Sequence, residues 1–163
     1  MGKEIIIVDK NDNIVGYKDF SDMKKEDIYR VSALWLTNSK GEVLLAKRAY
    51  NKKHHPGKWG PAVAGTIEKG ETYGSNIKKE AKEEIGLDGI EFIKGPKTFY
   101  NNDFFHFTQW YTVVVDRGID DFFIDNNEVA EIKWFSKKEI NKKIEEDPEF
   151  FLPNLPSYFE LFK

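Results

Sequence analysis

The chain has 163 residues and a net charge of −3, with 40% hydrophobic and 33% charged residues. This length and composition suit one domain spanning residues 1–163 with a buried core, and they exclude intrinsic disorder. The slight negative charge argues against a long nucleic-acid partner. The absence of cysteine excludes disulfides, thiolate metal sites and cysteine nucleophiles.

The chain begins with the pattern of a β-hairpin at about residues 4–18. Residues 5–8 and 14–17 are apolar, and the polar stretch 9–13 between them has the composition of a turn. The first apolar run is far too short for a signal peptide or a membrane span. We therefore expect a cytoplasmic protein without a membrane partner.

The remaining apolar and β-branched runs predict further strands. Residues 29–37 and 42–48 flank a polar turn and predict a second hairpin, and the other strands are expected at 59–67, 90–99, 105–115 and 128–135. The basic loop 50–57 contains His54 and His55, which we interpret as solvated residues rather than metal ligands because no matching ligand cluster accompanies them.

Three segments have helical patterns. Between Thr72 and Ile85 apolar residues recur every fourth position, and Gly86 stands where a left-handed cap would end the helix. A second helix is expected from Ser136 to about residue 146, and a short third one lies within 153–163. Strands and helices without a repeat or linker indicate an α+β fold.

The first helix carries a concentration of carboxylates. Glu80, Glu83 and Glu84 project within one sector beside the apolar stripe. Like charges at this spacing repel one another, and a bound cation would relieve the repulsion. Mg²⁺ and Mn²⁺ prefer oxygen ligands and leave positions for water and phosphate. Taken alone, such a helix is more often a solvated face with ion pairs such as Lys79 with Glu83.

The spacing of the surrounding residues favours the metal interpretation. Residues 65–87 resemble the Nudix box, which is a Gly, five residues, a Glu, seven residues, and then Arg-Glu-apolar-x-Glu-Glu-x-Gly-apolar. Only Lys79, which stands in place of the arginine, departs from this pattern. The resemblance implies the Nudix fold, a mixed β-sheet between helices (α/β/α), with Mg²⁺ or Mn²⁺ bound by the box. It also implies hydrolysis of a nucleoside diphosphate linked to another group.

The resemblance also implies roles for individual residues. Metal ligation falls to three carboxylates and one carbonyl group: Glu80, Glu83, Glu84 and Gly65. Glu83 is also a candidate base that acts through water, while Glu71 and Gly86 would hold the box in shape. Lys79 keeps the charge of the arginine but lacks its planar fork, so we expect lower activity rather than none.

Two candidates lie outside the box. Glu128, in a polar loop before the last strand, is our candidate general base, although an exposed loop glutamate needs no function. Arg48, at a strand end, is suited to bind substrate phosphate, although it would equally be a surface charge. Four aromatic residues would be able to stack on a base, but strand periodicity favours the core for them: Trp35, Trp59, Phe107 and Trp110.

Two other functions compete with hydrolysis. The N-terminal hairpin and residues 56–59 resemble the branch that contains isopentenyl-diphosphate isomerase, but Ala64 and Thr66 replace the cysteine and the histidine that this isomerase needs. A nucleotide-binding domain without catalysis usually loses box carboxylates, which are all present here. We therefore favour hydrolysis of a small diphosphate. The sequence identifies neither the nucleotide nor the attacked phosphorus, and it does not decide between a monomer and a homodimer.

Overall fold

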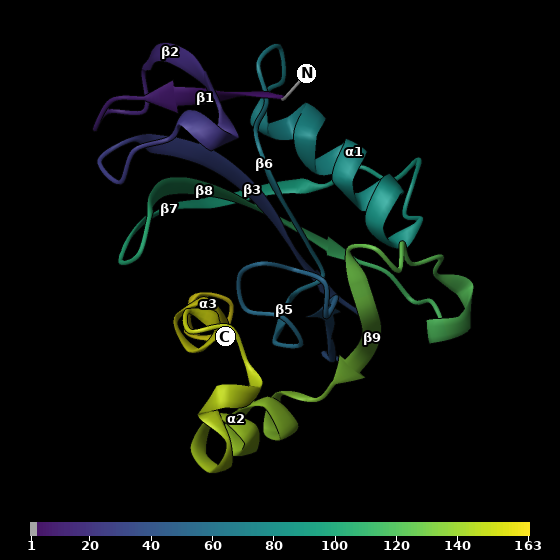
Figure 1. Cartoon of the computed structure of the whole chain (residues 1–163). Helices are drawn as coiled ribbons and strands as arrows, with labels where there is room; N and C mark the ends of the chain where they lie inside the picture. Colours follow the sequence, from purple (N-terminus) through teal and green to yellow (C-terminus); the bar gives the residue numbers. More distant parts are fainter. Residues whose placement is uncertain (1–2) are drawn as a thin grey trace.

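The computed structural model describes residues 3–163, which form a branched β-sheet with three α-helices (Figure 1). The strands are β1 Glu4–Val8, β2 Ile14–Asp19, β3 Ile28–Thr37, β4 Val43–Arg48, β5 Trp59–Pro61, β6 Val63–Thr66, β7 Ile93–Asn101, β8 Phe105–Val114 and β9 Val129–Phe135. The helices are α1 Tyr73–Ile85, α2 Lys137–Glu146 and α3 Leu155–Leu161.

Strand β3 is the centre of the sheet. One of its edges pairs in parallel with β8 along the whole strand, whereas β1, β6 and β4 share the other edge in turn. The expected hairpin of 29–37 with 42–48 is correct only at its turn, because β4 leaves β3 after two residue pairs and continues with β5 and β9. The expected strand at 59–67 is likewise divided into β5 and β6. The sheet therefore splits, and β4 diverges from β6.

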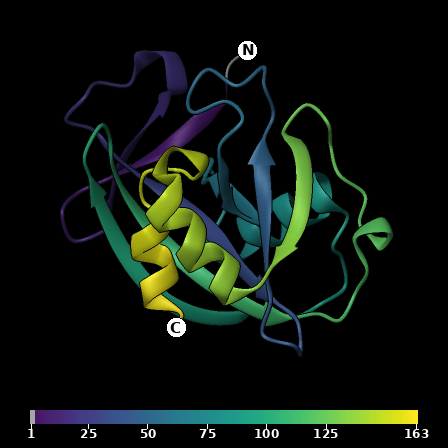
Figure 2. The same cartoon turned by 90° about the horizontal axis from the view of Figure 1, so that it is seen from below.

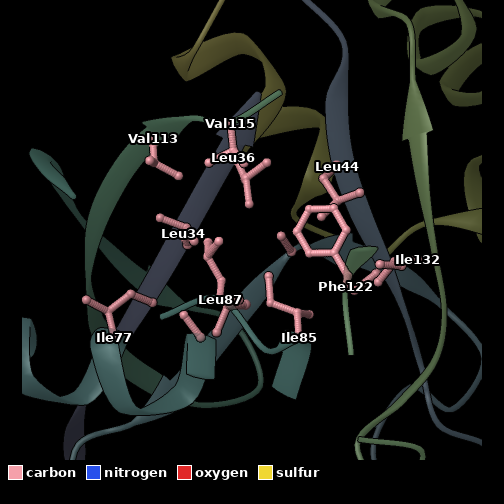
Figure 3. Close-up of a cluster of buried hydrophobic side chains, with 14 of the residues drawn as sticks. Leu34, Leu36, Leu44, Ile77, Ile85, Leu87, Val113, Val115, Phe122 and Ile132 are labelled. Carbon is pink, nitrogen blue, oxygen red and sulfur yellow. The ribbon is translucent and has the colours of Figure 1, made fainter. Parts of the chain in front are cut away.

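The helices cover both faces of the sheet. Figure 2 shows α2 and α3 on one face and α1 beyond the other. Alternate residues of β3 serve the two sides: Leu34 and Leu36 belong to the core under α1, while Trp35 packs with Trp110 and Phe159 under α3 (Figure 3 shows the first of these cores). This is the mixed sheet between helices that the sequence predicted. Within residues 3–163, no helix combines the length and the hydrophobicity needed to cross a bilayer.

Helix α1 is fixed at both ends by local bonds. The Thr72 hydroxyl accepts a hydrogen bond from the Ser75 amide, and the Ser75 hydroxyl caps the Thr72 amide in return. Gly86 adopts the left-handed conformation, with φ of 69°, and donates to carbonyl groups of the last turn. A Cβ atom there would also lie 3.0 Å from the Cβ atom of Phe123. The expected helix, its buried stripe and its glycine cap are confirmed.

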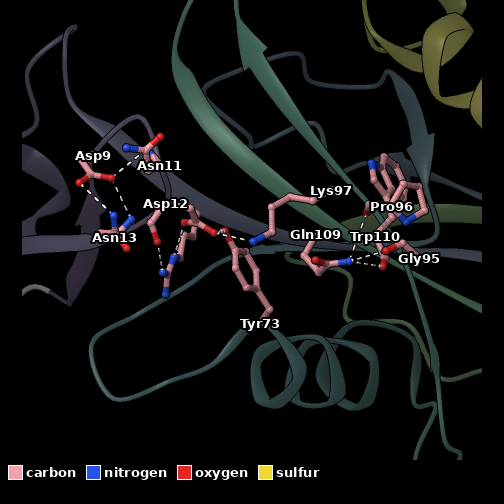
Figure 4. Close-up of polar contacts among 11 residues, drawn as sticks. Asp9, Asn11, Asp12, Asn13, Tyr73, Gly95, Pro96, Lys97, Gln109 and Trp110 are labelled. Carbon is pink, nitrogen blue, oxygen red and sulfur yellow. Dashed lines mark hydrogen bonds and ion pairs between the residues drawn. The ribbon is translucent and has the colours of Figure 1, made fainter.

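The turn of the N-terminal hairpin is anchored to the sheet and to α1 through Asp12. Its carboxylate accepts hydrogen bonds from Arg30 Nε at 2.7 Å, Lys97 Nζ at 2.6 Å and the Tyr73 hydroxyl at 2.9 Å (Figure 4). Burial acts to raise the pKa of Asp12, but these donors outweigh it and the pKa is lowered. One carboxylate thus joins the turn to β3, β7 and the first residue of α1.

Candidate active site

The split in the sheet opens a cleft of about 760 Å³ beside α1. Residues of β4 and β5 form one wall, and the backbone of β6 together with α1 forms the other. Glu80, Glu83 and Glu84 line it from the helix, and Arg48 and Glu128 line it from the opposite side. The cleft therefore brings together residues that are far apart in the sequence.

Gly65 is where the backbone of β6 meets the carboxylate helix. It pairs with Ser32 of β3, and a Cβ atom at this position would lie 2.5 Å from Glu80 Cγ and 2.9 Å from Asn76 Oδ1. Real Cβ atoms do not approach other atoms so closely, so any larger residue would displace Glu80. Glycine is required here by this close approach.

Glu80 and Glu84 are neighbouring, partly buried carboxyl groups, and each influences the pKa of the other. Burial is the main cause that raises the pKa of both groups, and for Glu84 the charges of Glu80 and Glu128 raise it further, to about 9. Two adjacent acids in a poorly solvated wall favour any species that brings positive charge. The pair therefore has the chemistry of a site for a hard cation.

Glu83 lies apart from this pair. Its side chain is exposed, although it lines the same cleft and its charge acts to raise the pKa of Glu80. Nowhere in the part of the chain that the structure describes do three His, Asp or Glu side chains approach closely enough to hold a metal ion. The structure thus brings together two of the three carboxylates expected as ligands, and Glu83 would have to turn to join them.

Lys79 lies between acidic residues at the base of the site. Its ammonium group is 2.7 Å from Glu71 and 3.6 Å from both Glu68 and Glu80. Burial acts to raise the pKa of Glu71, but the hydrogen bonds from Lys79, the Glu68 amide and Asn76 lower it overall. Lys79 therefore links the loop before α1 to the metal-ligand candidate Glu80.

Asn76 is part of the site although it lies outside the residues that the box pattern defines. Its side chain is fully buried, accepts a hydrogen bond from Ser32 Oγ at 2.5 Å, and donates to Thr66 O and Glu71 Oε1, both at 3.2 Å. The box pattern leaves this position undefined. The one available signal is a polar residue one helical turn before Glu80, at the edge of the apolar stripe.

The loop that carries Glu128 is held against the end of α1 by its backbone. The Phe123 and Asp125 amides donate to the carbonyl groups of Ile85 and Glu84 at 3.1 and 2.9 Å, and the Ala49 amide donates to Glu128 O at 3.0 Å. These bonds bring Glu128 near Glu84, but its carboxylate forms an ion pair with Lys52. Lys52 lies in the basic loop and was not among the expected site residues.

Arg48 lies at the end of β4, where the pairing with β9 shifts register. Its Nε donates to the His54 carbonyl at 3.0 Å. Burial lowers the pKa of Arg48, while the nearby charges of Glu128 and Glu84 act to raise it. The guanidinium group is thus fixed beside the carboxylates. The exposed His54 and His55 side chains lie outside the carboxylate pair.

The four aromatic residues considered as base-stacking candidates have different surroundings. The three tryptophans are buried in the core under α2 and α3, with at most 4% of their surfaces exposed: Trp35, Trp59 and Trp110. Phe107 is half-buried and packs against a small core under the N-terminal hairpin. The core interpretation is therefore confirmed for the tryptophans, and they do not form the substrate pocket.

Comparison with known proteins agrees with this architecture. The model of the NUDIX domain family matches residues 28–155. An uncharacterized Nudix hydrolase of Yersinia pestis is 24% identical over 86% of this chain and 76% of its own length. An isopentenyl-diphosphate Delta-isomerase of Photorhabdus laumondii is 26% identical over 93% of this chain and 87% of its own.

Solved structures show the same fold. DR0079 from Deinococcus radiodurans superposes with a TM-score of 0.83 at 20% identity, covering 99% of this chain and all of the other. A MutT protein from Methanosarcina mazei superposes with a TM-score of 0.68, also at 20% identity, over 83% of this chain and 92% of its own. Because the family model covers most of the chain and several relatives are named Nudix hydrolases, this protein belongs to the NUDIX domain family and is a Nudix hydrolase.

Proposed function

We propose that this protein uses Mg²⁺ or Mn²⁺ to hydrolyse a diphosphate bond in a small nucleoside diphosphate-linked substrate. Nudix hydrolases act in general as pyrophosphohydrolases on small molecules. The observation that carries the proposal for this chain is the carboxyl pair of Glu80 and Glu84, which lies with Arg48 in one cleft and of which Glu80 packs against Gly65. This arrangement supports a site in which a metal ion and a substrate phosphate would bind side by side.

The donor set fits a hard divalent cation. Glu80, Glu84 and the Gly65 carbonyl would supply oxygen ligands, and Glu83 would add a third carboxylate by turning its exposed side chain. When bound, such a cation neutralises charge on the diphosphate and lowers the pKa of a coordinated water. Lys79 and Glu71 would keep Glu80 in place through their ion pair.

Two residues on the opposite wall would act on the substrate. Arg48 is suited to bind phosphate oxygens, since its guanidinium group is fixed in the cleft and already lies near anionic groups. Glu128 would serve as the general base after substrate binding separates it from Lys52, whose ammonium group occupies it in this structure. The cytoplasmic location stays a prediction, and a homodimer stays one alternative to a monomer.

Isomerisation of isopentenyl diphosphate is the main alternative, since one relative carries that name. It requires an acid that protonates carbon, and the position before Gly65 is occupied by Ala64, whose methyl group has no acidic proton. A non-catalytic nucleotide-binding domain is disfavoured because every box carboxylate is present. The preserved carboxylates and the missing acid together favour hydrolysis.

The proposal is tested with a substrate panel in the presence of Mg²⁺ or Mn²⁺. The panel contains nucleoside diphosphate sugars, dinucleoside polyphosphates, nucleoside triphosphates, ADP-ribose and isopentenyl diphosphate, with product analysis by mass spectrometry. We expect hydrolysis of at least one nucleotide and no isomer of isopentenyl diphosphate. Glu84→Gln should lower kcat by more than about 100-fold, whereas Glu145→Gln, at an exposed position of α2, should match the wild type.

The proposed function is wrong if no member of the panel is hydrolysed, or if Glu84→Gln hydrolyses it as fast as the wild type. Appearance of dimethylallyl diphosphate from isopentenyl diphosphate would instead support the isomerase alternative. Nucleotide binding without turnover by a folded wild-type protein would support the binding domain.

A further inference from the structure

A second cavity, of about 300 Å³, adjoins the catalytic cleft on the α3 side of the sheet. The two cavities share wall residues, which are Phe20, Arg48, Ala64, Gly65, Thr66 and Leu152. The second one continues between the start of α3 and the tip of the β7–β8 hairpin. A group attached to a diphosphate in the cleft can therefore enter it directly.

The floor of this cavity is a row of rings across three neighbouring strands. The register places Tyr29 of β3 beside His106 of β8, and His106 beside Tyr100 of β7. The ring centroids are 5.1 Å apart in the first pair and 4.8 Å apart in the second, which is stacked. Phe104, at the hairpin tip, is 40% exposed and meets the His54 ring edge-on. The cavity thus presents aromatic surface to its contents.

His106 offers one polar atom to this cavity. Its Nδ1 lies 3.1 Å from the Thr108 hydroxyl, while Nε2 has no hydrogen-bond partner among residues 3–163. Within those residues no side-chain nitrogen or oxygen is both buried and without a partner. Nε2 must therefore be accessible, and the cavity is the space that His106 lines. It is the ring atom left to contact a ligand.

The charge state of His106 narrows the chemistry of that ligand. Burial lowers the pKa of His106 to about 4, so the ring is neutral near pH 7. A neutral imidazole does not attract phosphate by charge, but it forms one directional hydrogen bond. Asp103 at the hairpin tip and Asn154 before α3 also line the cavity and add further polar groups. This combination suits a flat ring with a polar edge.

We propose that this cavity binds the nucleobase of the substrate and that His106 Nε2 forms a hydrogen bond with the edge of the base. The inference rests on the proposed hydrolysis of a nucleoside diphosphate and adds the part of the site that selects the nucleoside. The volume of the second cavity lies at the lower end of the range for ligand pockets, which suits a single ring system. A hydrocarbon chain would bury His106 Nε2 without giving it a hydrogen-bond partner, at a cost in binding free energy.

The test measures binding without turnover. Isothermal titration of the metal-free protein would use ADP, CDP, GDP and UDP, together with ribose 5-diphosphate and geranyl diphosphate, which share the diphosphate but lack a base. We expect at least one nucleoside diphosphate to bind about tenfold more tightly than both base-free compounds. The same nucleotide should shift the ¹⁵N signal of His106 Nε2, and geranyl diphosphate should not.

Variants separate the hydrogen bond from the stacking. His106→Phe keeps a ring between Tyr29 and Tyr100 and should weaken the preferred nucleotide about tenfold, whereas geranyl diphosphate should bind at least as tightly as to the wild type. His106→Gln, whose amide nitrogen reaches the position of Nε2, should keep most of the affinity. Tyr100→Leu should weaken the binding of every nucleoside diphosphate, whereas Phe99→Leu, at the preceding residue and on the other face of β7, should not.

The outcomes distinguish this inference from the proposed function. Equal binding of geranyl diphosphate and the nucleotides, or an equal loss of all ligands in His106→Phe, would overturn the base pocket. Cleavage of the same compounds with Mg²⁺ is measured separately. Base-dependent binding without any cleavage would refute the proposed hydrolysis but support the base pocket. Cleavage without a preference for a base would support the hydrolysis but refute the base pocket.

Discussion

At the scale of single residues, Lys79 shows what the departure from the family pattern changes. Its ammonium group contacts Glu71 at 2.7 Å but reaches Glu68 and Glu80 only at 3.6 Å. A guanidinium group in its place would present several donors in one plane and would hold two carboxylates at once. The lysine forms a close ion pair with Glu71 and longer ones with Glu68 and Glu80, so it holds Glu80 less firmly than an arginine would.

Replacing Lys79 should therefore lower kcat when the new residue has no charge and maintain or raise it when the new residue is arginine. We expect Lys79→Met to lower kcat by about 10- to 100-fold, the usual effect of losing a group that orients a metal ligand, and Lys79→Arg to match or exceed the wild type. Lys82→Met, at an exposed position of the same helix, is the matched control. Steady-state kinetics and a Mn²⁺ titration of each variant provide the measurement. A Lys79→Met enzyme with unchanged kcat and Mn²⁺ affinity would exclude the positioning role.

Site residues differ in how far the sequence reveals them. The resemblance to the Nudix box identifies Gly65, Glu71 and the helix carboxylates as candidates. The structure brings Gly65 against Glu80 and joins Glu71 to Lys79, because β6, the following loop and α1 are consecutive and pack together. Asn76 and Lys52 do not, because hydrogen bonds to Ser32 and an ion pair with Glu128 depend on how distant segments fold together. The sequence likewise gives no sign that Glu83 would stand away from the Glu80 and Glu84 pair.

At the scale of elements, local signals were the reliable ones. The apolar period, the caps of α1 and α2 and the turn of the first two strands are all properties of consecutive residues, and each element forms where it was expected. The separation of β4 from β3 was missed, because the partners that draw β4 away, β5 and β9, come later in the chain. Which strands pair depends on the competition between segments that are distant in the sequence, and the composition of each segment alone does not predict its outcome.

The hairpin anchor at Asp12 gives a stability prediction. Asp12→Asn keeps the size of the side chain and tolerates its φ of 64°, but it loses the charge that Arg30 and Lys97 face. We expect the free energy of unfolding to fall by about 1–3 kcal/mol at pH 7. Urea denaturation measures this loss, with Asp22→Asn at an exposed position as the control.

The same comparison has a defined pH dependence. The pKa of Asp12 in the folded protein is below its ordinary value of 3.8, so the unfolded chain binds the proton first as the pH falls. The stabilisation is complete above that value and is lost as the pH falls through the lowered pKa. The gap between the wild type and Asp12→Asn should therefore narrow below about pH 4. A gap that stays constant down to pH 2.5 would refute the charged anchor.

At the scale of the whole molecule, the buried carboxyl groups of the cleft beside α1 should lower the stability of the metal-free protein. The pKa of Glu84 is raised to about 9 from 4.5, so the folded protein holds a proton that the unfolded chain releases. Between these values stability should decrease as the pH rises. Without divalent metal, Glu84→Gln should melt roughly 3–6 °C above the wild type at pH 8, and the two should converge at pH 4.5.

Differential scanning calorimetry with EDTA, and then with Mn²⁺, measures this effect. Mn²⁺ should raise the melting temperature of the wild type at pH 8, because a ligand bound only by the folded state stabilises it, and should raise that of Glu84→Gln much less. Equal melting curves for the two proteins at pH 8 in EDTA would show that the buried carboxyl group of Glu84 does not lower the stability of the metal-free protein. Glu145→Gln again serves as the surface control.

The parallel pairing of β3 with β8 also sets the order in which the molecule can be completed. It joins Ile28 to Phe105, so residues 65–87 lie inside the loop that this pairing closes. During synthesis the carboxylate helix leaves the ribosome before the strand that completes its sheet, and such distant parallel contacts form slowly. A nascent chain that ends before residue 105 would hold every box residue on an unfinished sheet, with the edge of β3 open to other unfolded chains.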